Sequence, residues 1–566
     1  MRYIRPASEA VNCILQSFNA FDRRIANAPD QALNCTDDFR NSRWSESIVV
    51  KAPIQSYTGV FRESKSAEAE ASNFSESVGI KGSYGIFSAS VQYNSSTKIT
   101  RSSTSFNSST HCQICRGTVH LKTSTDILGY LDENLVQSLQ SIRSLVDAEA
   151  FTKKYGTHVV TAVSLGGLFG ITTSIETGSY TKLSKVSAEV SAKYGGALGS
   201  VELTAKVASE ISRETSYGSV LQFTRAIGGD PIKAQGIDLR NPETLKAWAA
   251  SCNEDAIFAV HDTKEYWALI EKTEASVLLR TYLNLVITAQ SIKNPTIFSA
   301  IAPTQPFVEN RATATVNEDY KIISGGANVK IGTSSFLCGS YPQYDDNKRI
   351  NGWIAVSHDI ATPSSQDDTI TAYALAFYDP YDLFEVRMTE VTVGNQGIGM
   401  SKVEATLDPG YCLTGGGCSF FCKGNLKYII SSYPEGSSWR IAMSDYDRAS
   451  ENAEVTAYAL GLAPSSKLRS EVSITKNVTK QTSSTALSHG NMNVSLSEGL
   501  RIAGGGVSLT AWNAGHGNLV QQCYPGMNNQ WFEYNSDLNG SYSPVVATAY
   551  GINLTVECQN LSLLKA

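Results

Sequence analysis

Few side chains in this 566-residue chain could do chemistry, and their spacing matches no catalytic centre. His158 precedes a run of apolar residues, and no nucleophile is paired with it at a recognisable spacing, which favours a packing role. Phosphate loops of the form Gly-x-x-x-x-Gly-Lys-Ser/Thr, His-Glu-x-x-His zinc motifs and Gly-x-Ser-x-Gly elbows do not occur. We therefore expect a protein that is not an enzyme and needs no cofactor.

The cysteines do not predict a metal site. His111, Cys112 and Cys115 could supply half of a zinc site, but no second close pair of ligands lies nearby in the sequence. Eleven cysteines, an odd number, do not form a dense disulfide framework in a chain of this length. We expect a local disulfide or free thiols at Cys112 and Cys115, and no bound metal.

Length and charge limit the organisation of the protein and its partners. A chain of 566 residues is too long for one core and predicts two or three domains. The net charge of −6, without a basic block, disfavours nucleic acid as a partner. No run of about 20 apolar residues predicts a membrane-spanning helix, and the N-terminus lacks the apolar core of a secretory signal. We expect a soluble protein that is released without an evident signal peptide.

Residues 185–210 carry two amphipathic patterns at once. Read with a period of two, they form a β-hairpin with one charged and one apolar face. Its apolar positions are Val186, Ala188, Val190, Ala192, Val201, Leu203, Ala205 and Val207. Read with a period of 3.6, each arm is a short amphipathic helix. The abundance of Ala, Ser, Lys and Glu favours helices in water, whereas a bilayer admits so short a segment only within a closed barrel. The alternative is a surface helical hairpin that never changes shape.

A second alternating segment lies earlier in the chain, at residues 74–94. Its apolar positions are Val78, Ile80, Phe87, Ala89, Val91 and Tyr93, and they alternate with Ser, Gly, Lys and Gln on both sides of Gly85. Glu76 falls on the apolar face and departs from the pattern. This segment is a second candidate for a membrane-inserting hairpin.

Between the two segments stands a short motif. Tyr155-Gly156-Thr157-His158 is followed, after seven residues, by Gly166-Gly167. The motif resembles the signature of the membrane attack complex/perforin (MACPF) family. Further matches to the family are Gly228-Gly229-Asp230-Pro231 and the helical run at 242–285. Val159 departs from the aromatic residue that usually follows the histidine.

The resemblance implies a specific fold and a change of shape. MACPF domains contain a bent four-stranded sheet flanked by two clusters of short helices, and each cluster can unwind into a transmembrane β-hairpin. The two alternating segments lie in the chain where these clusters are expected. Because glycine has no Cβ, Gly166 and Gly167 would let a strand bend and later straighten, although an ordinary bulge would need the same residues.

The C-terminal half contains three copies of a repeat. Each copy has a glycine pair or triplet, a Tyr-Pro pair, a tryptophan and a Thr-Ala-Tyr triplet in that order. The tyrosine of the Tyr-Pro pair and the tryptophan are Tyr341 and Trp353 in the first copy, Tyr433 and Trp439 in the second, and Tyr524 and Trp531 in the third. Short strands alternate with turns rich in Gly, Ser and Asn, so three equivalent sheets around a pseudo-threefold axis, a β-prism, are expected. A three-bladed propeller is the less common alternative.

The order of domains resembles that of some bacterial MACPF proteins, including insecticidal ones, whose appended β-prism is thought to recognise a membrane surface. Trp353, Trp439 and Trp531, each with its nearby tyrosine, could form three stacking platforms for sugar rings. We favour the alternative that the tryptophans fill the core of the prism. A lipid headgroup is another candidate ligand, although no basic cluster supports a purely electrostatic grip.

Taken together, the sequence predicts an α+β protein. A MACPF fold, a bent antiparallel sheet with two helical clusters, is expected over residues 1–300, and an all-β pseudo-threefold β-prism over 301–566, with repeats at about 310–378, 379–465 and 466–566. The predicted function is a pore-forming toxin, insecticidal by resemblance, that binds a lipid or glycan of the target-cell membrane and self-associates into a ring. Two hairpins per subunit would then form a β-barrel. The alternative is a recognition or adhesion protein that never perforates.

Overall fold

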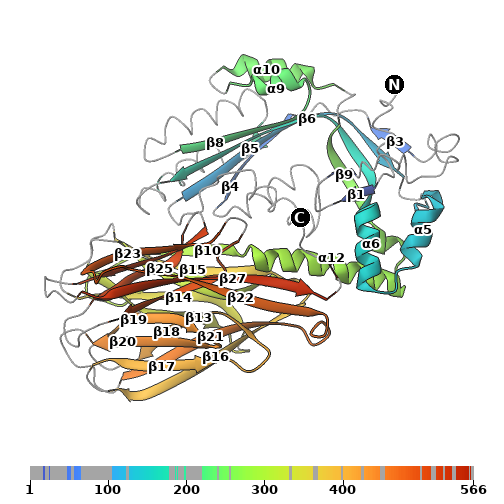
Figure 1. The fold of residues 1–566 in the computed structure, drawn as a ribbon. Coiled ribbons are helices and arrows are strands. Elements are labelled where there is room, and N and C mark those ends of the chain that lie inside the picture. The colour runs from blue at the N-terminus through green and yellow to red at the C-terminus, as the bar shows by residue number, and fades with distance from the viewer. Residues whose placement is uncertain are drawn as a thin grey trace. The chain divides into compact units, whose positions relative to one another are not determined.

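The computed structural model describes most of residues 105–176 and 220–561, with short stretches at 17–19, 24–25, 48–51, 57–64 and 197–198 and single positions at 185 and 188. The chain divides into two compact units, Met1–Asn284 and Leu285–Ala566. Both units are rich in antiparallel strands (Figure 1).

The first unit is built on a nine-stranded sheet whose two longest strands run through its middle. These are β5 (Ser105–Leu121) and β6 (His158–Glu176), which pair with each other along most of their length. The other strands are β1 (Ser17–Asn19), β2 (Arg24–Ile25), β3 (Ile48–Lys51), β4 (Tyr57–Ser64), β7 (Ala197–Leu198), β8 (Val220–Gly228) and β9 (Ile257–Glu265). Figure 1 shows the long strands curving strongly along their length.

The outer strands of this sheet change partner position at the bend. On one side, β4 pairs with residues 107–114 of β5, whereas β3 pairs with residues 118–121. On the other side, β8 pairs with residues 167–175 of β6, whereas β9 pairs with residues 158–165. Apart from the short strands β1, β2 and β7, the sheet is therefore four strands wide on each side of the bend, and only β5 and β6 cross it.

Seven helical segments of 3 to 20 residues are described between β5 and β10. They are the 3₁₀ turn η2 (Leu128–Tyr130), α5 (Glu133–Gln140), α6 (Leu145–Tyr155), α9 (Pro231–Gln235), α10 (Pro242–Ser251), α11 (Tyr266–Leu269) and α12 (Glu274–Lys293), counted among the described residues. Several begin at side chains that accept hydrogen bonds from the first free amides, such as Asp132, Ser144 and Asp230. Pro231 and Pro242 begin α9 and α10, where the backbone amide that proline lacks would have no partner within the helix.

The second unit contains three six-stranded antiparallel sheets. The first consists of β10 (Thr296–Pro303), β15 (Thr369–Tyr378), β12 (Tyr320–Val329), β25 (Leu519–Gly526), β26 (Gln530–Ser536) and β23 (His489–Ser495). The second consists of β11 (Asn310–Thr315), β14 (Ile350–Asp359), β13 (Ser335–Tyr344), β18 (Cys412–Phe421), β21 (Ala453–Pro464) and β16 (Phe384–Gln396). The third consists of β17 (Ser401–Thr406), β20 (Ser438–Asp445), β19 (Lys427–Glu435), β24 (Gly504–Thr510), β27 (Val546–Cys558) and β22 (Val472–Thr482).

Each sheet of the prism is shared by two repeats. Every repeat has six strands, of which the first, sixth and third form one half-sheet and the second, fifth and fourth form another. Half-sheets of neighbouring repeats join along short central ladders, such as Ser340 opposite Cys418 and Ser432 opposite Val507. The ladder between Ala327 and Cys523 joins the first repeat to the last and closes the prism. The first strand of the first repeat is β10, which lies before residue 310 and carries none of the motif residues.

The glycine triplets of the repeats are required by three close approaches. A Cβ on Gly416 would overlap the Trp439 indole, which packs the two half-sheets of one repeat together. A Cβ on Gly417 would overlap the Ser340 carbonyl of the neighbouring repeat. A Cβ on Gly415 would meet Ser324, its counterpart in the first repeat. The same contacts recur at Gly504, Gly505 and Gly506, and at Gly325 and Gly326. Absence of a side chain therefore lets the strands meet at the prism axis.

The third repeat departs from the other two at Glu533. This residue lies two positions after the tryptophan, where the other repeats have Ala355 and Ile441. It is fully buried, and neither carboxylate oxygen accepts a hydrogen bond of normal geometry from a described residue. Burial raises its pKa well above the ordinary value of 4.5, and the nearby Met492 amide offsets only part of that rise. The carboxyl group is therefore an unfavourable element of the core once it ionises.

We predict that Gly416→Ala lowers the free energy of unfolding of the second unit by about 1–3 kcal/mol, because the new methyl group would overlap an indole and a backbone carbonyl. Denaturant unfolding of the full chain measures this change. Gly394→Ala is the matched control, since its Cβ would have only one neighbour within 4 Å, at 3.9 Å. Equal effects of the two substitutions would contradict the close-approach account.

We predict that Glu533→Ile raises the unfolding temperature more at about pH 8 than at about pH 4.5. The folded protein holds the Glu533 proton more tightly than the unfolded chain, so stability is lost as pH rises above the ordinary pKa of 4.5. Thermal unfolding at both pH values measures the difference. Exposed Glu454→Gln is the control, and an identical gain at both pH values would show that Glu533 does not titrate as described.

Candidate functional site

The Tyr-Gly-Thr-His motif ends a helix and begins the long strand β6. Gly156 has a φ of 78°, a left-handed conformation that favours glycine, and its amide donates to the Thr152 carbonyl at 2.8 Å. Tyr155 is buried, and its ring lies 5.1 Å from that of Phe151. The contacts of Tyr155 and Gly156 are those of a helix end that packs against the core.

His158 is also held by packing. Its Nδ1 lies 2.6 Å from the Thr157 hydroxyl, and its ring meets the Trp267 ring edge to face at 5.7 Å. Burial lowers the pKa of His158 to about 4, so the imidazole is neutral at physiological pH. These contacts make Thr157 and His158 packing residues of the core.

The bend of the sheet lies at Gly166 and Gly167, beside Gly228 and Gly229 of the neighbouring strand. Gly166 has a φ of 124°, and a Cβ there would overlap the Ile114 carbonyl on β5. A Cβ on Gly167 would overlap the Cys252 sulfur, and one on Gly228 would overlap the Gly166 carbonyl. The four glycines therefore bring the strands and the segment after α10 into contact at the bend.

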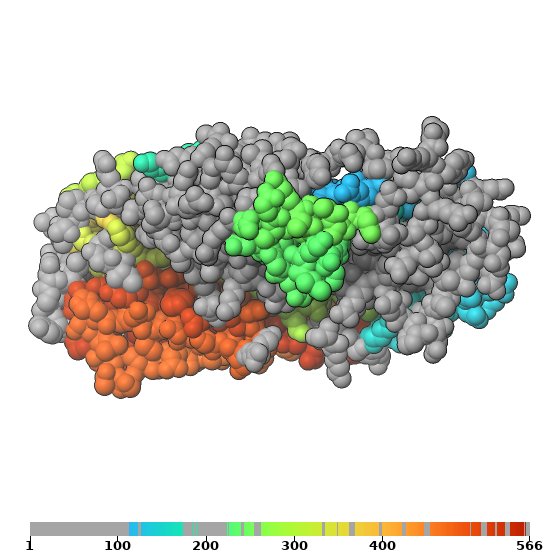
Figure 2. Space-filling model, turned by 90° about the horizontal axis from the view of Figure 1, so that it is seen from above, coloured from blue at the N-terminus to red at the C-terminus, as the bar shows by residue number. Residues whose placement is uncertain are grey.

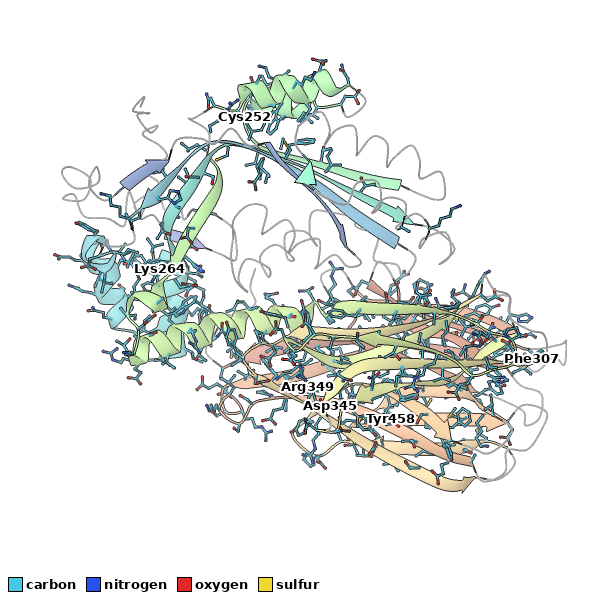
Figure 3. The ribbon with its side chains drawn as sticks, turned by 180° about the vertical axis from the view of Figure 1, so that it is seen from behind. Cys252, Lys264, Phe307, Asp345, Arg349 and Tyr458 are labelled. Atoms are coloured by element: carbon cyan, nitrogen blue, oxygen red, sulfur yellow. The ribbon has the colours of Figure 1, made fainter. Side chains whose placement is uncertain are left out.

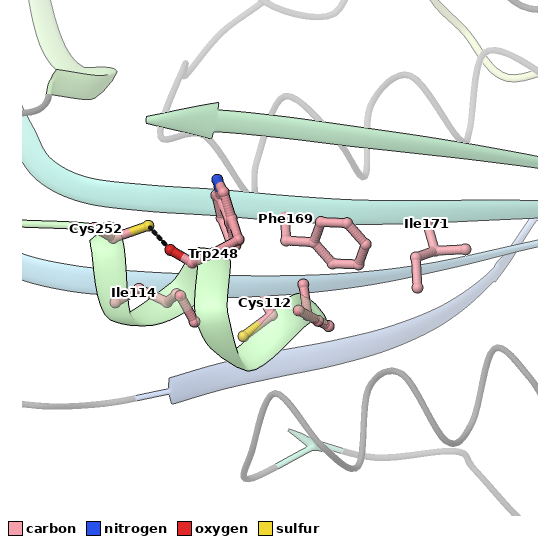
Figure 4. Close-up of a cluster of buried hydrophobic side chains, with 8 residues drawn as sticks. Cys112, Ile114, Phe169, Ile171, Trp248 and Cys252 are labelled. Atoms are coloured by element: carbon pink, nitrogen blue, oxygen red, sulfur yellow. Dashed lines mark hydrogen bonds between the residues drawn. The ribbon is translucent and has the colours of Figure 1, made fainter. Parts of the chain in front are cut away.

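The helices α9 and α10 cover the bend. Trp248 of α10 donates from Nε1 to the Gly228 carbonyl at 3.1 Å, and the Asp230 amide donates to the Ser251 hydroxyl at 2.9 Å. Arg116 of β5 donates from Nε to the Cys252 carbonyl at 2.9 Å. The buried side chains under α10 are those of Cys112, Ile114, Phe169, Ile171, Leu245, Trp248, Ala249 and Cys252 (Figure 4). The outer face of these helices lies on the molecular surface (Figure 2).

Sequence reasoning did not single out Trp248 and Cys252. Their only sequence signal is a tryptophan and a cysteine four residues apart near the end of a helix that follows a double glycine. Burial raises the pKa of Cys112 to about 12 and that of Cys252 to about 11, so both thiols are protonated. Cys112 and Cys115 are free thiols, and the described residues include no group of three or more metal-ligating side chains.

Most of the predicted hairpin residues lie outside the described residues. This holds for Val78, Ile80, Phe87, Ala89, Val91 and Tyr93 of the first hairpin, and for Val186, Val190, Ala192, Val201, Leu203, Ala205 and Val207 of the second. Ala188 is helical and exposed, as is Lys185. Ala197 and Leu198 form β7, which pairs with Val60 and Gly59 of β4.

The tryptophans of the prism are core residues and not sugar platforms. Trp353, Trp439 and Trp531 are each exposed by 1% or less, so no indole face is open to a ligand. Their Nε1 atoms donate to Ser340 and Ser432 hydroxyls at 2.9 Å and to the Cys523 sulfur at 3.3 Å, in the order of the repeats. The proposed platforms are therefore corrected to buried packing sites that hold the half-sheets of each repeat together.

The repeat tyrosines lie at the junctions between repeats. Tyr341 stacks on Tyr458 at 5.8 Å, and Tyr433 stacks on Tyr550 at 5.2 Å. Tyr524 stacks on Tyr373 at 5.2 Å in the sheet that closes the prism. Each pair joins strands of two repeats across the centre of one sheet. Their rings are thus already paired with a second aromatic ring, which leaves less of each face for a ligand.

One loop of the prism presents apolar side chains. Phe307, between β10 and β11, is 53% exposed, and Val308 is 44% exposed. Phe307 has a φ of 55°, a conformation that costs a bulky residue roughly 1–3 kcal/mol. Its amide donates to the buried Asp359 carboxylate at 3.2 Å. It is the one aromatic residue with a left-handed backbone among those described.

No curated protein matches the chain. Among solved structures, GNIP1Aa from Chromobacterium piscinae is 15% identical, with 72% of this chain and 77% of that chain covered and a TM-score of 0.34. Astrotactin-2, described as a vertebrate-specific and perforin-like membrane protein, is 11% identical, with 65% and 72% covered and a TM-score of 0.34. Likenesses at these TM-scores add no argument.

One family model matches the N-terminal part of the chain. No helix within the described part of the chain is both long and apolar enough to cross a bilayer. The family model described as the MAC/Perforin domain matches residues 32–294. This range contains the strands β3 to β9 of the bent sheet, the Tyr-Gly-Thr-His motif and the helices α9 and α10. The N-terminal part of the chain is therefore a MAC/Perforin (MACPF) domain, followed by three antiparallel sheets arranged as a β-prism.

Proposed function

We propose that the protein forms pores in a target membrane. The prism docks the chain on the membrane, the chains associate into a ring, and residues 65–104 and 177–219 convert into hairpins that close a β-barrel. Membership of the MACPF family supports pore formation in general. The observation that carries this proposal is the register of the two strand ladders that lead into these segments.

The four strands that would be extended end at the same level of the sheet. Ser64 of β4 pairs with Asn107 of β5, near the start of that strand. Ser105 of β5 pairs with Glu176 of β6, and Ile175 pairs with Val220 of β8. One hairpin between β4 and β5 and another between β6 and β8 would therefore lengthen the whole sheet at one end.

The ladder between β6 and β8 has no register shift, since Gly167 pairs with Gly228 and Ile175 with Val220. Continued unchanged, this register places opposite charges directly across the second hairpin. It pairs Lys185 with Glu210, Glu189 with Lys206 and Lys193 with Glu202. It pairs Ala188 with Val207, Val190 with Ala205 and Ala192 with Leu203, and it puts Ala197 and Leu198 at the turn. Cross-strand pairs of opposite charge stabilise a sheet.

The ladder between β4 and β5 leads to a similar result. Continued without a shift, it pairs Val78 with Tyr93 and Ile80 with Val91, and it puts Gly85 in the turn. Apolar residues of the two arms thus fall opposite each other, as a lipid-facing surface requires. The alternation that defines these apolar positions is a property of the sequence and does not depend on the register of either ladder.

All four arms place their apolar residues on the same face of the extended sheet. Phe169 of β6, Ala226 of β8 and Cys112 of β5 face α10. Because side chains alternate along a strand, the apolar positions of every arm fall on the opposite face. The charged residues of the second hairpin then share the other face, which would line the pore. The three Lys and three Glu of these pairs in the second hairpin balance each other, so this hairpin alone supports little preference for ion charge.

The alternative function is recognition or adhesion without perforation. A MACPF protein could recognise a glycan or lipid and never perforate, and such a protein would not need paired arms of matching register. An insecticidal target stays a prediction from the order of the domains.

Locking the tip of the second hairpin tests the proposal. Val60 and Ala197 are paired between β4 and β7, so Val60→Cys with Ala197→Cys should join the tip to the sheet by a disulfide. The oxidised variant should bind vesicles made from target-cell lipid extracts without releasing an entrapped dye or forming rings, and reduction should restore both. Each single variant is the control. Undiminished dye release by the locked protein would contradict hairpin insertion.

Charge reversal tests the register. Lys193→Glu should slow dye release about fivefold or more, since it places like charges opposite each other in every subunit of the ring. Combining it with Glu202→Lys should restore release, because the pair is then reversed and intact. Lys402→Glu, on an exposed strand of the prism, is the control. Failure of the double variant to recover would mean that these two residues are not paired.

A further inference from the structure

Two amides and two carbonyls of the loop of residues 304–309 are hydrogen-bonded to buried side chains. Asn310, 5% exposed, accepts from the Gln305 amide at 2.6 Å and donates to the Gln305 and Val308 carbonyls at 3.1 Å. Asp359, 2% exposed, accepts from the Phe307 amide at 3.2 Å. The tip of the loop can therefore enter an apolar environment without leaving these backbone groups unpaired.

The second repeat shows that the aromatic ring is not needed to build such a loop. Gly399 occupies the matching place before β17, and its amide donates to Asp445 at 3.0 Å. Gly399 has a φ of 103°, and a Cβ there would meet nothing within 4 Å. In the first repeat a phenylalanine with a φ of 55° donates to the corresponding aspartate, and more than half of the surface of this phenylalanine is exposed. The backbone strain at Phe307 thus serves the presentation of its ring outward.

The chemistry of the loop favours hydrocarbon over a charged headgroup. Phe307 and Val308 stand at its tip, and the only charged residue between Thr304 and Glu309 is Glu309 itself. An acidic residue repels anionic lipid, so attraction of charge does not explain this tip. Phe421, 64% exposed at the end of β18, lies at the same end of the prism by strand register. Figure 3 shows Phe307 at the end of the unit away from Asp345 and Arg349.

We propose that the 304–309 loop is a membrane anchor, in which Phe307 and Val308 insert into the apolar part of a bilayer. This inference rests on the proposed function for the existence of a target membrane. The contact is a shallow insertion of two side chains, held rigid by Asn310 and Asp359. The end of the prism that carries this loop faces the lipid.

Phe307→Gly separates an anchoring role from a structural one. Glycine relieves the left-handed strain, so the unfolding temperature of the full chain should stay equal or rise. Binding to phosphatidylcholine vesicles, measured by flotation, should fall about tenfold or more, because a buried phenylalanine is lost. Binding of the wild-type protein should change little between about 0.15 M and 1 M salt, since the contact is apolar. Phe307→Trp should keep binding and be quenched by brominated lipid.

Leu500→Gly is the matched control, because Leu500 is 39% exposed at the opposite end of the prism, beside Asn529. Its binding should equal that of the wild-type protein. Equal binding by Phe307→Gly, or no binding of the wild-type protein to phosphatidylcholine vesicles, would overturn the anchor. If the wild-type protein releases dye and Phe307→Gly binds equally well, the pore function stands without the anchor. If binding depends on Phe307 and no dye is released, the anchor stands without the pore.

Discussion

Close approach of backbone and side chain at glycine is the constraint on which both units depend. At the bend, the four glycines of β6 and β8 leave no room for a Cβ, and the space is taken by Trp248, Cys252 and strand carbonyls. In the prism, a glycine of each repeat lies under a tryptophan and the next lies against the neighbouring repeat. Strands can come this near only where a side chain is missing, so the same residue type curves one sheet and closes another.

The sheet of the first unit consists of two halves that share β5 and β6. Because the outer strands are replaced at the bend, no outer ladder spans it, and only the ladder between β5 and β6 continues across it. The cover formed by α9 and α10 bridges β5, β6 and β8 through Arg116, Trp248 and the buried cluster. Flattening the sheet would require these contacts to shift, whereas the ladders that lead toward residues 65–104 and 177–219 would remain in register.

The interior of the prism follows the threefold repeat of the sequence. Its three tryptophans and three tyrosine pairs repeat with the symmetry of the fold, which explains their buried or stacked positions. Features that break the symmetry are few: Glu533 in the interior and Phe307 on the surface are two of them. Symmetric residues serve packing that each repeat needs, so departures from symmetry are the positions where a single repeat gains a property of its own.

The sequence by itself determined the features that depend on neighbouring residues. The Tyr-Gly-Thr-His motif and its glycines indicated the MACPF domain, and the spacing of the aromatic residues revealed three repeats. Only the tertiary structure decided which strands share a sheet, because strand partners lie far apart in the chain and a repeat pattern is the same whichever neighbour it pairs with. It also decided that the tryptophans are buried, that Trp248 and Cys252 cover the bend, and that Phe307 is turned outward, since each of these depends on contacts between distant segments.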